Sequence, residues 1–221
     1  MMPYLPSSHA DDKLRAHVVE VCRRMYQHGF IAAADGNVSV RLDGDFVLLT
    51  PSGLHKGYLT PGDLVVCDLN GNRVAGHNRP SSEFLLHRAY YTQRPDVRAV
   101  VHAHPPITVA LALAGVSLEP CILTETYIAL GPVPTVPYAT PTTDEVPAAL
   151  RPFVAQANAV ILDRHGSVTV GETLDEAYNR LESLEHSARI IHAAQVIGRV
   201  TPLPTFKVAK LRAVKDTLRS K

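Results

Sequence analysis

The sequence predicts an α/β protein whose sheet is mostly antiparallel. Short apolar or alternating runs are joined by Asp43-Gly44, Pro61-Gly62 and Asn70-Gly71, which are turn signals typical of neighbouring antiparallel strands. Longer stretches carry apolar residues at helical spacing behind capping motifs. With 221 residues, of which 46% are hydrophobic, the chain is long enough for one buried core. We therefore expect one domain over 1–221, with a core at about 11–198.

Helices are expected where apolar stripes lie between start and stop residues. They are a first helix with the stripe Leu14, Val18, Val21, Cys22 and Met25, which Gly29 ends; a second from the N-cap Ser82 to Pro95; a third over 107–113; a fourth from Thr142 toward Gln156; and a fifth from the capping box at Thr173 to Gly198. The tail over 202–221 is basic and only weakly amphipathic. We expect it to form a peripheral helix or a mobile end that reaches another subunit.

Strands are expected between these helices, where alternating or continuous apolar runs are bounded by turn residues. The expected ranges are 38–41, 45–50, 64–68, 73–75, 100–104, 121–126, 133–136, 159–163 and 167–170.

Composition gives no reason to expect nucleic acid or a membrane as a partner. Lys and Arg total 22 against 21 Asp and Glu, which leaves a formal net charge of +1. The most apolar window, 97–118, is interrupted by Arg98, two histidines and two prolines, so no membrane span follows from it. The N-terminus lacks the apolar core of a secretory signal. Three widely spaced cysteines indicate free thiols in a reducing compartment, and we expect a cytoplasmic protein.

The chemistry centres on His102-Ala103-His104 in the strand expected over 100–104. Residues two apart in a strand project from one face, so the two imidazoles should lie side by side. Three such nitrogen donors with one open position are typical of a catalytic zinc site, so we expect a third ligand elsewhere. A pair of strand histidines held by ordinary hydrogen bonds is the alternative that this motif leaves open.

His165 is the candidate for that third ligand, because it follows a strongly predicted strand and precedes Gly166. A turn histidine can equally be exposed without function. Glu83 lies in the first turn of a predicted helix, where the dipole favours a carboxylate in any case. Beside a metal it could act as a general base and acid. His87, one turn later, is interpreted as a packing or hydrogen-bonding residue.

Three short motifs predict an anion-binding cradle: Gly36-Asn37-Val38-Ser39, Thr50-Pro51-Ser52-Gly53 and Ser81-Ser82. Backbone N–H groups in glycine turns, hydroxyl groups and a helix N-terminus together can hold a phosphate without a formal positive charge. Each motif taken alone is also an ordinary turn or cap.

The ordered motifs Gly-Asn-Val-Ser, Thr-Pro-Ser-Gly, Ser-Ser-Glu, His-Ala-His and His-Gly resemble the class II aldolase/adducin family. The resemblance runs from about residue 14 to 197, and within the family the chain most resembles the zinc-dependent L-fuculose-phosphate aldolases. It implies a three-layer α/β/α fold with a central, mostly antiparallel sheet. It also implies a fourfold homotetramer with active sites at subunit interfaces.

Carried over to this sequence, the resemblance implies that His102, His104 and His165 bind one Zn²⁺. Glu83 would be the acid/base that also approaches the metal when no substrate is present. The family's aldolases use tyrosines from a neighbouring subunit. Tyr127 is the candidate for one of them, whereas the C-terminal tail contains no tyrosine. The residues that would hold the substrate phosphate are Gly36, Asn37, Ser52, Gly53, Ser81 and Ser82.

The activity implied is aldehyde-lyase chemistry on a sugar phosphate. The substrate would be a ketose 1-phosphate that resembles fuculose 1-phosphate, or a 5-deoxy or 5-methylthio ribulose 1-phosphate, cleaved to dihydroxyacetone phosphate and an aldehyde. Dehydratases, decarboxylases and 4-epimerases of sugar phosphates share the scaffold, although the epimerases usually carry aspartate at the position of Glu83. An adducin-like binding module without metal or turnover is the non-enzymatic alternative.

Overall fold

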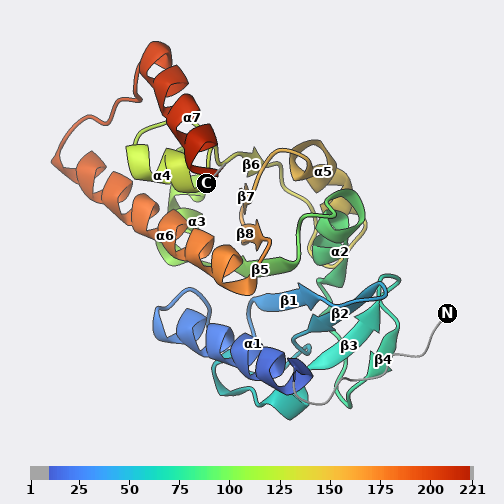
Figure 1. The fold of residues 1–221 in the computed structure, drawn as a ribbon. Coiled ribbons are helices and arrows are strands. Elements are labelled where there is room, and N and C mark those ends of the chain that lie inside the picture. The colour runs from blue at the N-terminus through green and yellow to red at the C-terminus, as the bar shows by residue number, and fades with distance from the viewer. Residues whose placement is uncertain (1–9, 220–221) are drawn as a thin grey trace.

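Eight strands form one sheet in the computed structural model, which describes residues 10–219 (Figure 1). Only the β6–β7 pair is parallel, and every other neighbouring pair is antiparallel. The prediction of a mostly antiparallel sheet is therefore confirmed. In spatial order the strands are β4 (Arg73–Ala75), β3 (Val65–Asp68), β2 (Phe46–Leu49), β1 (Asn37–Arg41), β5 (Ala99–Ala103), β8 (Gly166–Gly171), β7 (Ala159–Leu162) and β6 (Thr135–Val136).

Helices cover both faces of this sheet, which confirms the three-layer α/β/α arrangement (Figure 1). On one face lie α1 (Ala10–Gln27), α3 (Pro106–Leu113) and α6 (Leu174–Ile197). On the other lie α2 (Phe84–Gln93) and α5 (Glu145–Val154). Two short 3₁₀ turns, η1 (Lys56–Tyr58) and η2 (Pro61–Asp63), connect β2 to β3.

Side-chain alternation separates the two faces of the central strands β1 and β5. Val38 and Val101 pack into the core beneath α1 and α6. Val100 packs into the opposite core, beneath α2 and α5. Because successive residues of a strand point to opposite faces, Ser39 and His102 lie on the α2 side of the sheet. Buried polar residues of the two adjacent strands thus face the same helix.

One element differs in kind from the prediction. The segment expected as a strand over 121–126 instead forms a loop that enters a short helix, α4 (Thr124–Ala129). Its apolar residues Ile122 and Leu123 pack against the cluster formed by α3 and α6, without strand partners. The apolar run reflects burial against helices, which periodicity alone does not distinguish from burial in a sheet.

Two element ends also differ from the prediction. The N-cap of α2 is Glu83 rather than Ser82, and the Ser81 hydroxyl accepts a hydrogen bond from Glu83 N at 3.3 Å. His104 lies just beyond the end of β5.

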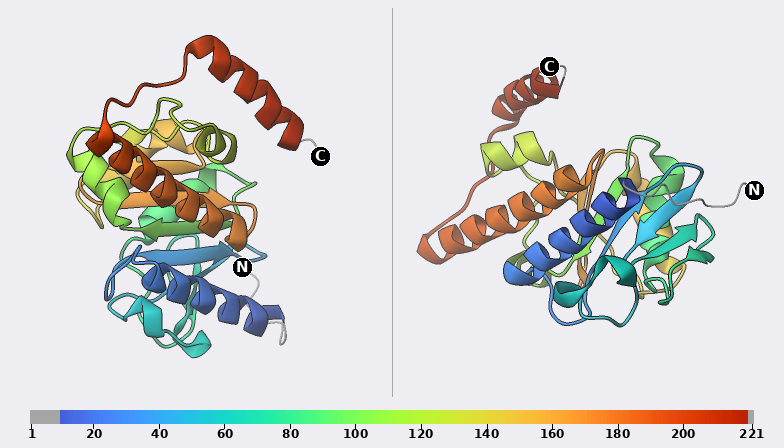
Figure 2. Two further views of the ribbon diagram at one scale, coloured as in Figure 1. Left: turned by 90° about the vertical axis from the view of Figure 1, so that its left-hand side faces the viewer. Right: turned by 60° about the horizontal axis from the view of Figure 1, so that its bottom comes forward.

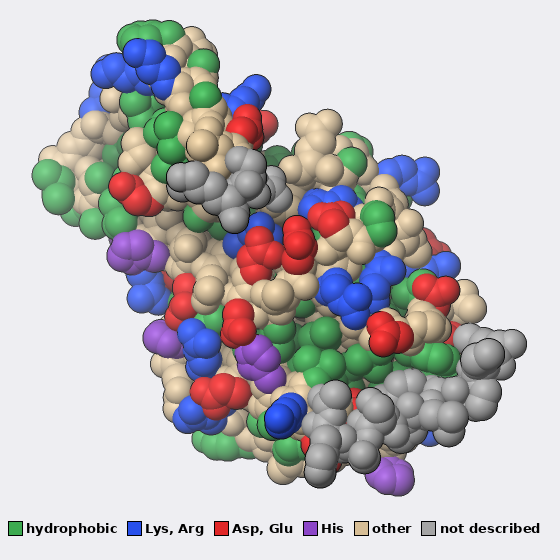
Figure 3. Space-filling model, viewed as in Figure 1, with side chains coloured by type: hydrophobic (Ala, Val, Ile, Leu, Met, Phe, Trp, Pro, Cys, Tyr) green, Lys and Arg blue, Asp and Glu red, His purple; other side chains and the backbone are tan. Residues whose placement is uncertain are grey.

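The tail forms a peripheral helix, α7 (Thr205–Arg219), which extends away from the sheet (Figure 2). Its Lys207, Lys210 and Arg212 side chains are exposed, and Lys and Arg side chains gather on the surface over this helix (Figure 3). Lys215 Nζ donates to the carbonyl of Tyr127 at 3.3 Å, which attaches α7 to α4. Among the helices of residues 10–219, none combines the length and the apolar character that crossing a membrane requires.

Candidate metal centre and active site

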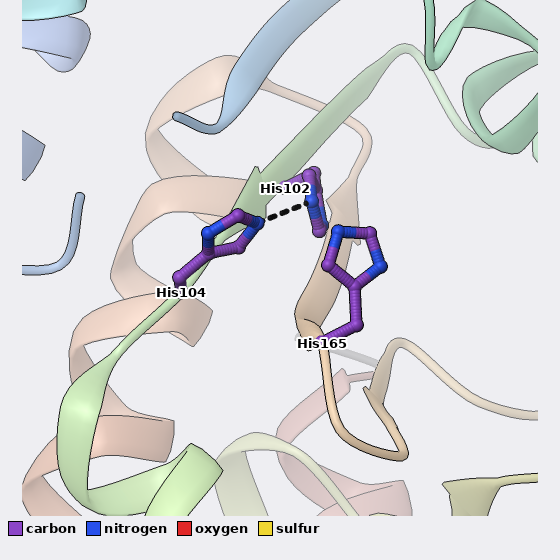
Figure 4. A group of neighbouring side chains, drawn as sticks. All are labelled: His102, His104 and His165. Atoms are coloured by element: carbon purple, nitrogen blue, oxygen red, sulfur yellow. Dashed lines mark hydrogen bonds between the residues drawn. The ribbon is translucent and has the colours of Figure 1, made fainter. Parts of the chain in front are cut away.

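Three imidazoles converge at the ends of β5 and β7 (Figure 4). His102 Nε2 and His104 Nε2 are 3.0 Å apart, and the His165 ring centroid lies 4.8 Å from that of His102 and 4.9 Å from that of His104. Each ring offers a nitrogen within 4.8 Å of the nitrogens of the other two. The structure thus brings together the three histidines that the sequence singled out.

The sheet fixes His102 in a definite tautomer. Its Nδ1 lies 2.9 Å from the backbone carbonyl of Ser167, which can only accept a hydrogen bond, so Nδ1 carries the proton. Burial lowers the pKa of His102, so the ring is neutral and its Nε2 has a free lone pair. This is the form of imidazole that binds a divalent metal, with an oriented carbonyl supporting the other nitrogen. The donor set therefore fits a metal ion.

His165 reaches the other two rings because Gly166 follows it. A Cβ at position 166 would lie 2.4 Å from the carbonyl oxygen of Ala103 and 2.7 Å from Cδ2 of His104. Arg164, in the same turn, adopts a left-handed conformation with φ of 58°. Glycine at position 166 is therefore required for this turn to approach β5 as closely as it does.

Glu83 completes the cluster from the start of α2. Its Oε1 lies 3.2 Å from His165 Nε2 and its Oε2 lies 3.4 Å from His102 Nε2. Asn37 Nδ2 donates to Oε2 at 2.8 Å. Burial by itself raises the pKa of Glu83, but the neighbouring His165, His102 and Asn37 more than offset this effect. Its pKa lies well below the ordinary value, so Glu83 is a carboxylate in the structure.

The three segments of the predicted cradle lie side by side. An isolated bridge joins Pro51 to Pro80, and Ser52 N donates to the carbonyl of Arg79 at 2.9 Å. Val38 N donates to the hydroxyl of Thr50 at 3.1 Å. These bonds place the loops that carry Ser52, Gly53, Ser81 and Ser82 next to the start of β1, where Gly36 and Asn37 lie.

Lys56 is a functional candidate that the sequence analysis missed. Its side chain is buried, and Nζ donates to the carbonyls of Ala34 at 2.8 Å and Leu54 at 2.9 Å. It thereby connects the loop before Gly36 to the loop after Gly53. Burial lowers its pKa, and more distant carboxylates, including Asp35 and Glu83, partly oppose this effect. Nothing in the sequence marks this lysine, because its partners are backbone carbonyls.

Asp35 is a second residue that the sequence analysis missed. Its carboxylate lies 3.6 Å from His104 Nδ1, at the outer edge of the cluster. Burial lowers the pKa of His104, and Asp35 partly opposes that shift. Its position directly before the Gly-Asn motif is the only signal that the sequence offers.

Tyr127 is not part of this cluster within one chain. It lies in α4, largely buried, and borders a recess lined by residues of α6 that include Leu184 and Ser187. Its ring lies 6.0 Å from Lys215 Nζ on α7. The structure therefore places Tyr127 among α4, α6 and α7 rather than beside the histidines.

Comparison with known proteins places the chain in a family. Residues 16–192 match the Class II Aldolase and Adducin N-terminal domain. The chain belongs to the class II aldolase/adducin family.

Two kinds of curated relative are similar over most of the chain. A 3-oxo-tetronate 4-phosphate decarboxylase of Cupriavidus necator is 34% identical over 184 residues, which are 81% of this chain and 84% of that protein. An L-fuculose phosphate aldolase of Methanococcus maripaludis is 31% identical over 172 residues, or 78% of this chain and 92% of that protein.

Two solved structures superimpose on most of the chain. YgbL of Escherichia coli superimposes with a TM-score of 0.84 at 30% identity, covering 92% of this chain and 99% of its own. An L-fuculose 1-phosphate aldolase superimposes with a TM-score of 0.82 at 28% identity, covering 94% of this chain and 96% of its own. Both likenesses extend over nearly the whole fold.

Proposed function

We propose that the protein is a metal-dependent carbon–carbon lyase that acts on a sugar phosphate. The observation that carries this proposal is the convergence of His102, His104 and His165 beside the Glu83 carboxylate. The three histidines would hold the metal, which we take to be Zn²⁺. When bound, such an ion supplies Lewis-acid polarisation of a substrate carbonyl oxygen.

Glu83 is the group that would move the proton. Its Oε2 accepts a hydrogen bond from Asn37, whereas Oε1 lies 3.2 Å from His165 Nε2. In aldol cleavage, the bond that joins the hydroxyl-bearing carbon to the carbon next to the ketone breaks. The electron pair of this bond stays on the carbon next to the ketone. A carboxyl group at the position of Glu83 can deliver a proton to that carbon and take it back in the reverse reaction.

The cradle would bind the substrate phosphate at a distance from the reacting carbons. Backbone N–H groups of Gly36 and Gly53 and the hydroxyl groups of Ser52, Ser81 and Ser82 are suitable donors. Buried Lys56 donates to backbone carbonyls of two of these loops and adds one positive charge. Binding energy from this remote group can then serve to orient the reacting carbons.

The first candidate reaction is aldol cleavage of a ketose 1-phosphate to dihydroxyacetone phosphate and an aldehyde. It is supported by the L-fuculose phosphate aldolase among the relatives. Aldol cleavage also requires a base that removes the proton from the hydroxyl group on the carbon that becomes the aldehyde. Tyr127 of a neighbouring subunit is our candidate, in a homotetramer with active sites at the interfaces.

The second candidate is decarboxylation of a 3-oxo-tetronate 4-phosphate. It is supported by the Cupriavidus necator relative and by a property of this chain. Loss of carbon dioxide leaves the same electron-rich carbon next to a ketone but requires no base to remove a proton from a hydroxyl group. The tail after Pro202 contains Phe206 but no tyrosine, which agrees with a reaction that needs one proton acceptor fewer.

Product analysis separates the two reactions. The purified protein, loaded with Zn²⁺, is incubated with ketose 1-phosphates and with a 3-oxo-tetronate 4-phosphate. Both reactions release dihydroxyacetone phosphate, so the co-product decides: an aldehyde formed from a ketose 1-phosphate supports the aldolase, whereas carbon dioxide formed from the 3-oxo-tetronate 4-phosphate supports the decarboxylase. Failure of both substrate classes over a full screen would contradict the proposal.

We place the enzyme in the cytoplasm, in agreement with three free cysteines in the described residues.

A further inference from the structure

A chain of four buried polar side chains leads away from Glu83 into the space between β1 and α2. Asn37 Oδ1 is hydrogen-bonded to His87 Nε2. His87 Nδ1 lies 2.6 Å from the hydroxyl of Ser39, which lies 2.7 Å from the hydroxyl of Tyr91. All four side chains are at most 3% exposed. None of them belongs to the set of three histidines.

Each bond in this chain can point in only one direction. The Glu83 carboxylate only accepts, so the Asn37 amide must present its NH₂ to Glu83 and its oxygen to His87. His87 Nε2 must then carry a proton. Burial lowers the pKa of His87 to about 4, so at neutral pH its Nδ1 is bare and accepts from Ser39. The Ser39 oxygen in turn accepts from Tyr91.

We propose that His87 is a positioning residue that fixes the orientation of the Asn37 amide and thereby the role of each oxygen of Glu83. Oε2 always receives an N–H, which leaves Oε1 as the oxygen that exchanges the proton. The inference rests on the proposed function only in taking Glu83 as the acid/base. The direction of the chain from Tyr91 to Asn37 does not depend on it.

An apolar residue at position 87 would remove this constraint. The Asn37 amide could then rotate and turn its oxygen toward the Glu83 carboxylate, where two acceptors repel each other. A fully satisfied buried network specifies one arrangement, whereas a broken one leaves several. The loss of a hydrogen bond to a charged group corresponds to about 10- to 100-fold in rate.

The first test compares two variants at position 87. His87→Phe keeps the ring shape but removes both nitrogen atoms, and we expect kcat to fall about 10- to 100-fold with bound metal unchanged. His87→Gln retains one donor and one acceptor and should recover most of this loss. His77→Phe, at an exposed histidine, is the matched control and should leave kcat unchanged. A folded, metal-loaded His87→Phe enzyme with wild-type kcat would overturn the proposal.

A double-mutant cycle tests whether His87 acts through Asn37. In an Asn37→Ala background, His87→Phe should change kcat by less than about threefold, because the amide that it orients is absent. An equally large loss in that background would assign His87 an independent structural role and overturn the proposal.

A third readout requires no turnover. ¹⁵N NMR of the histidine-labelled, metal-free protein at neutral pH should show His87 as a neutral ring protonated at Nε2. A His87 ring protonated at Nδ1, or at both nitrogens, would contradict the proposed direction of the hydrogen bonds from Tyr91 to Asn37. If no substrate is turned over, or if His87→Phe does not fold, this measurement on the wild-type protein still decides. Failure of the proposed function and failure of this inference are therefore distinguishable.

Discussion

The histidine cluster and the region around α4 and α7 are held in place in different ways. In the cluster, β5 pairs with β1 and with β8, so the position of His102 is fixed from both sides. Gly166 then permits the turn that carries His165 to pass within contact distance of β5. The α4–α7 contact instead depends on a half-buried Lys215 and on exposed Arg212, which interacts with Tyr127. Backbone pairing fixes the first region throughout, whereas the second combines one backbone bond, from Leu203 N to the carbonyl of Cys121 at 2.8 Å, with flexible side chains of α7.

The difference indicates where substitutions should matter. Backbone pairing and steric contact allow little adjustment, whereas lysine and arginine side chains can move without disturbing a fold. Chemistry that needs fixed atoms is expected at the cluster.

The largest effect is expected for Gly166→Ala. The added methyl group would lie 2.4 Å from the Ala103 carbonyl oxygen, so the turn carrying His165 must move away from β5. We expect loss of stoichiometric metal, measured by elemental analysis after purification with added Zn²⁺. Gly198→Ala, where nothing lies within 4 Å of the added atom, is the control. Full metal content in Gly166→Ala would show that the cluster tolerates displacement.

Glu83→Gln should separate chemistry from metal binding. The three histidines remain, so the metal should stay bound. The amide cannot exchange a proton as the carboxylate does, so kcat should fall by about 10²- to 10⁴-fold. Steady-state kinetics together with metal analysis checks this prediction. Loss of the metal along with activity would instead assign Glu83 a mainly ligating role.

Lys56→Met should weaken the cradle without affecting the cluster. It removes the buried cation and its bonds to Ala34 and Leu54 while keeping a long apolar stem. We expect the affinity for inorganic phosphate, measured by calorimetry on the metal-loaded protein, to fall about tenfold, or about 1.4 kcal/mol. Lys210→Met on α7 is the control. Unchanged phosphate affinity would remove Lys56 from the proposed site.

Acidification should destabilise the metal-free protein. Burial lowers the pKa values of His87, His102 and His104, so the unfolded chain binds protons near pH 6.5 that the folded chain does not. Stability should therefore fall as the pH drops below 6.5, by about 2 kcal/mol at pH 5 for His87 alone. Urea unfolding at pH 7 and pH 5 measures the change. Equal midpoints would mean that these rings titrate normally.

The smallest effect is expected for Lys215→Ala. Removing its bond to the Tyr127 carbonyl should lower the free energy of unfolding by less than about 1 kcal/mol, because the group is only half buried. Metal content should not change. A loss as large as that of Gly166→Ala would contradict the contrast between the two regions.

Much of the site could be predicted from sequence, because its parts coincide with local signals. The two-residue spacing of His102 and His104 is a property of a strand, and His165 follows a strongly apolar strand. The Asn37–His87 chain depends instead on how β1 packs against α2, which no local pattern specifies. The role of Lys56 depends on backbone carbonyls of residues distant from it in the chain. The segment that enters α4 has a strand-like apolar run because Ile122 and Leu123 pack against the cluster that includes residues of α6, which local sequence does not reveal.

The central claim is that one metal ion is held by three imidazoles beside Glu83. X-ray absorption spectroscopy of the purified protein, combined with elemental analysis, tests it most directly. We predict one divalent ion per chain whose nearest ligands include three histidine nitrogens, with loss of the ion in His165→Ala. An ion whose nearest ligands include no histidine nitrogens, or one that His165→Ala retains in full with unchanged coordination, would contradict the account.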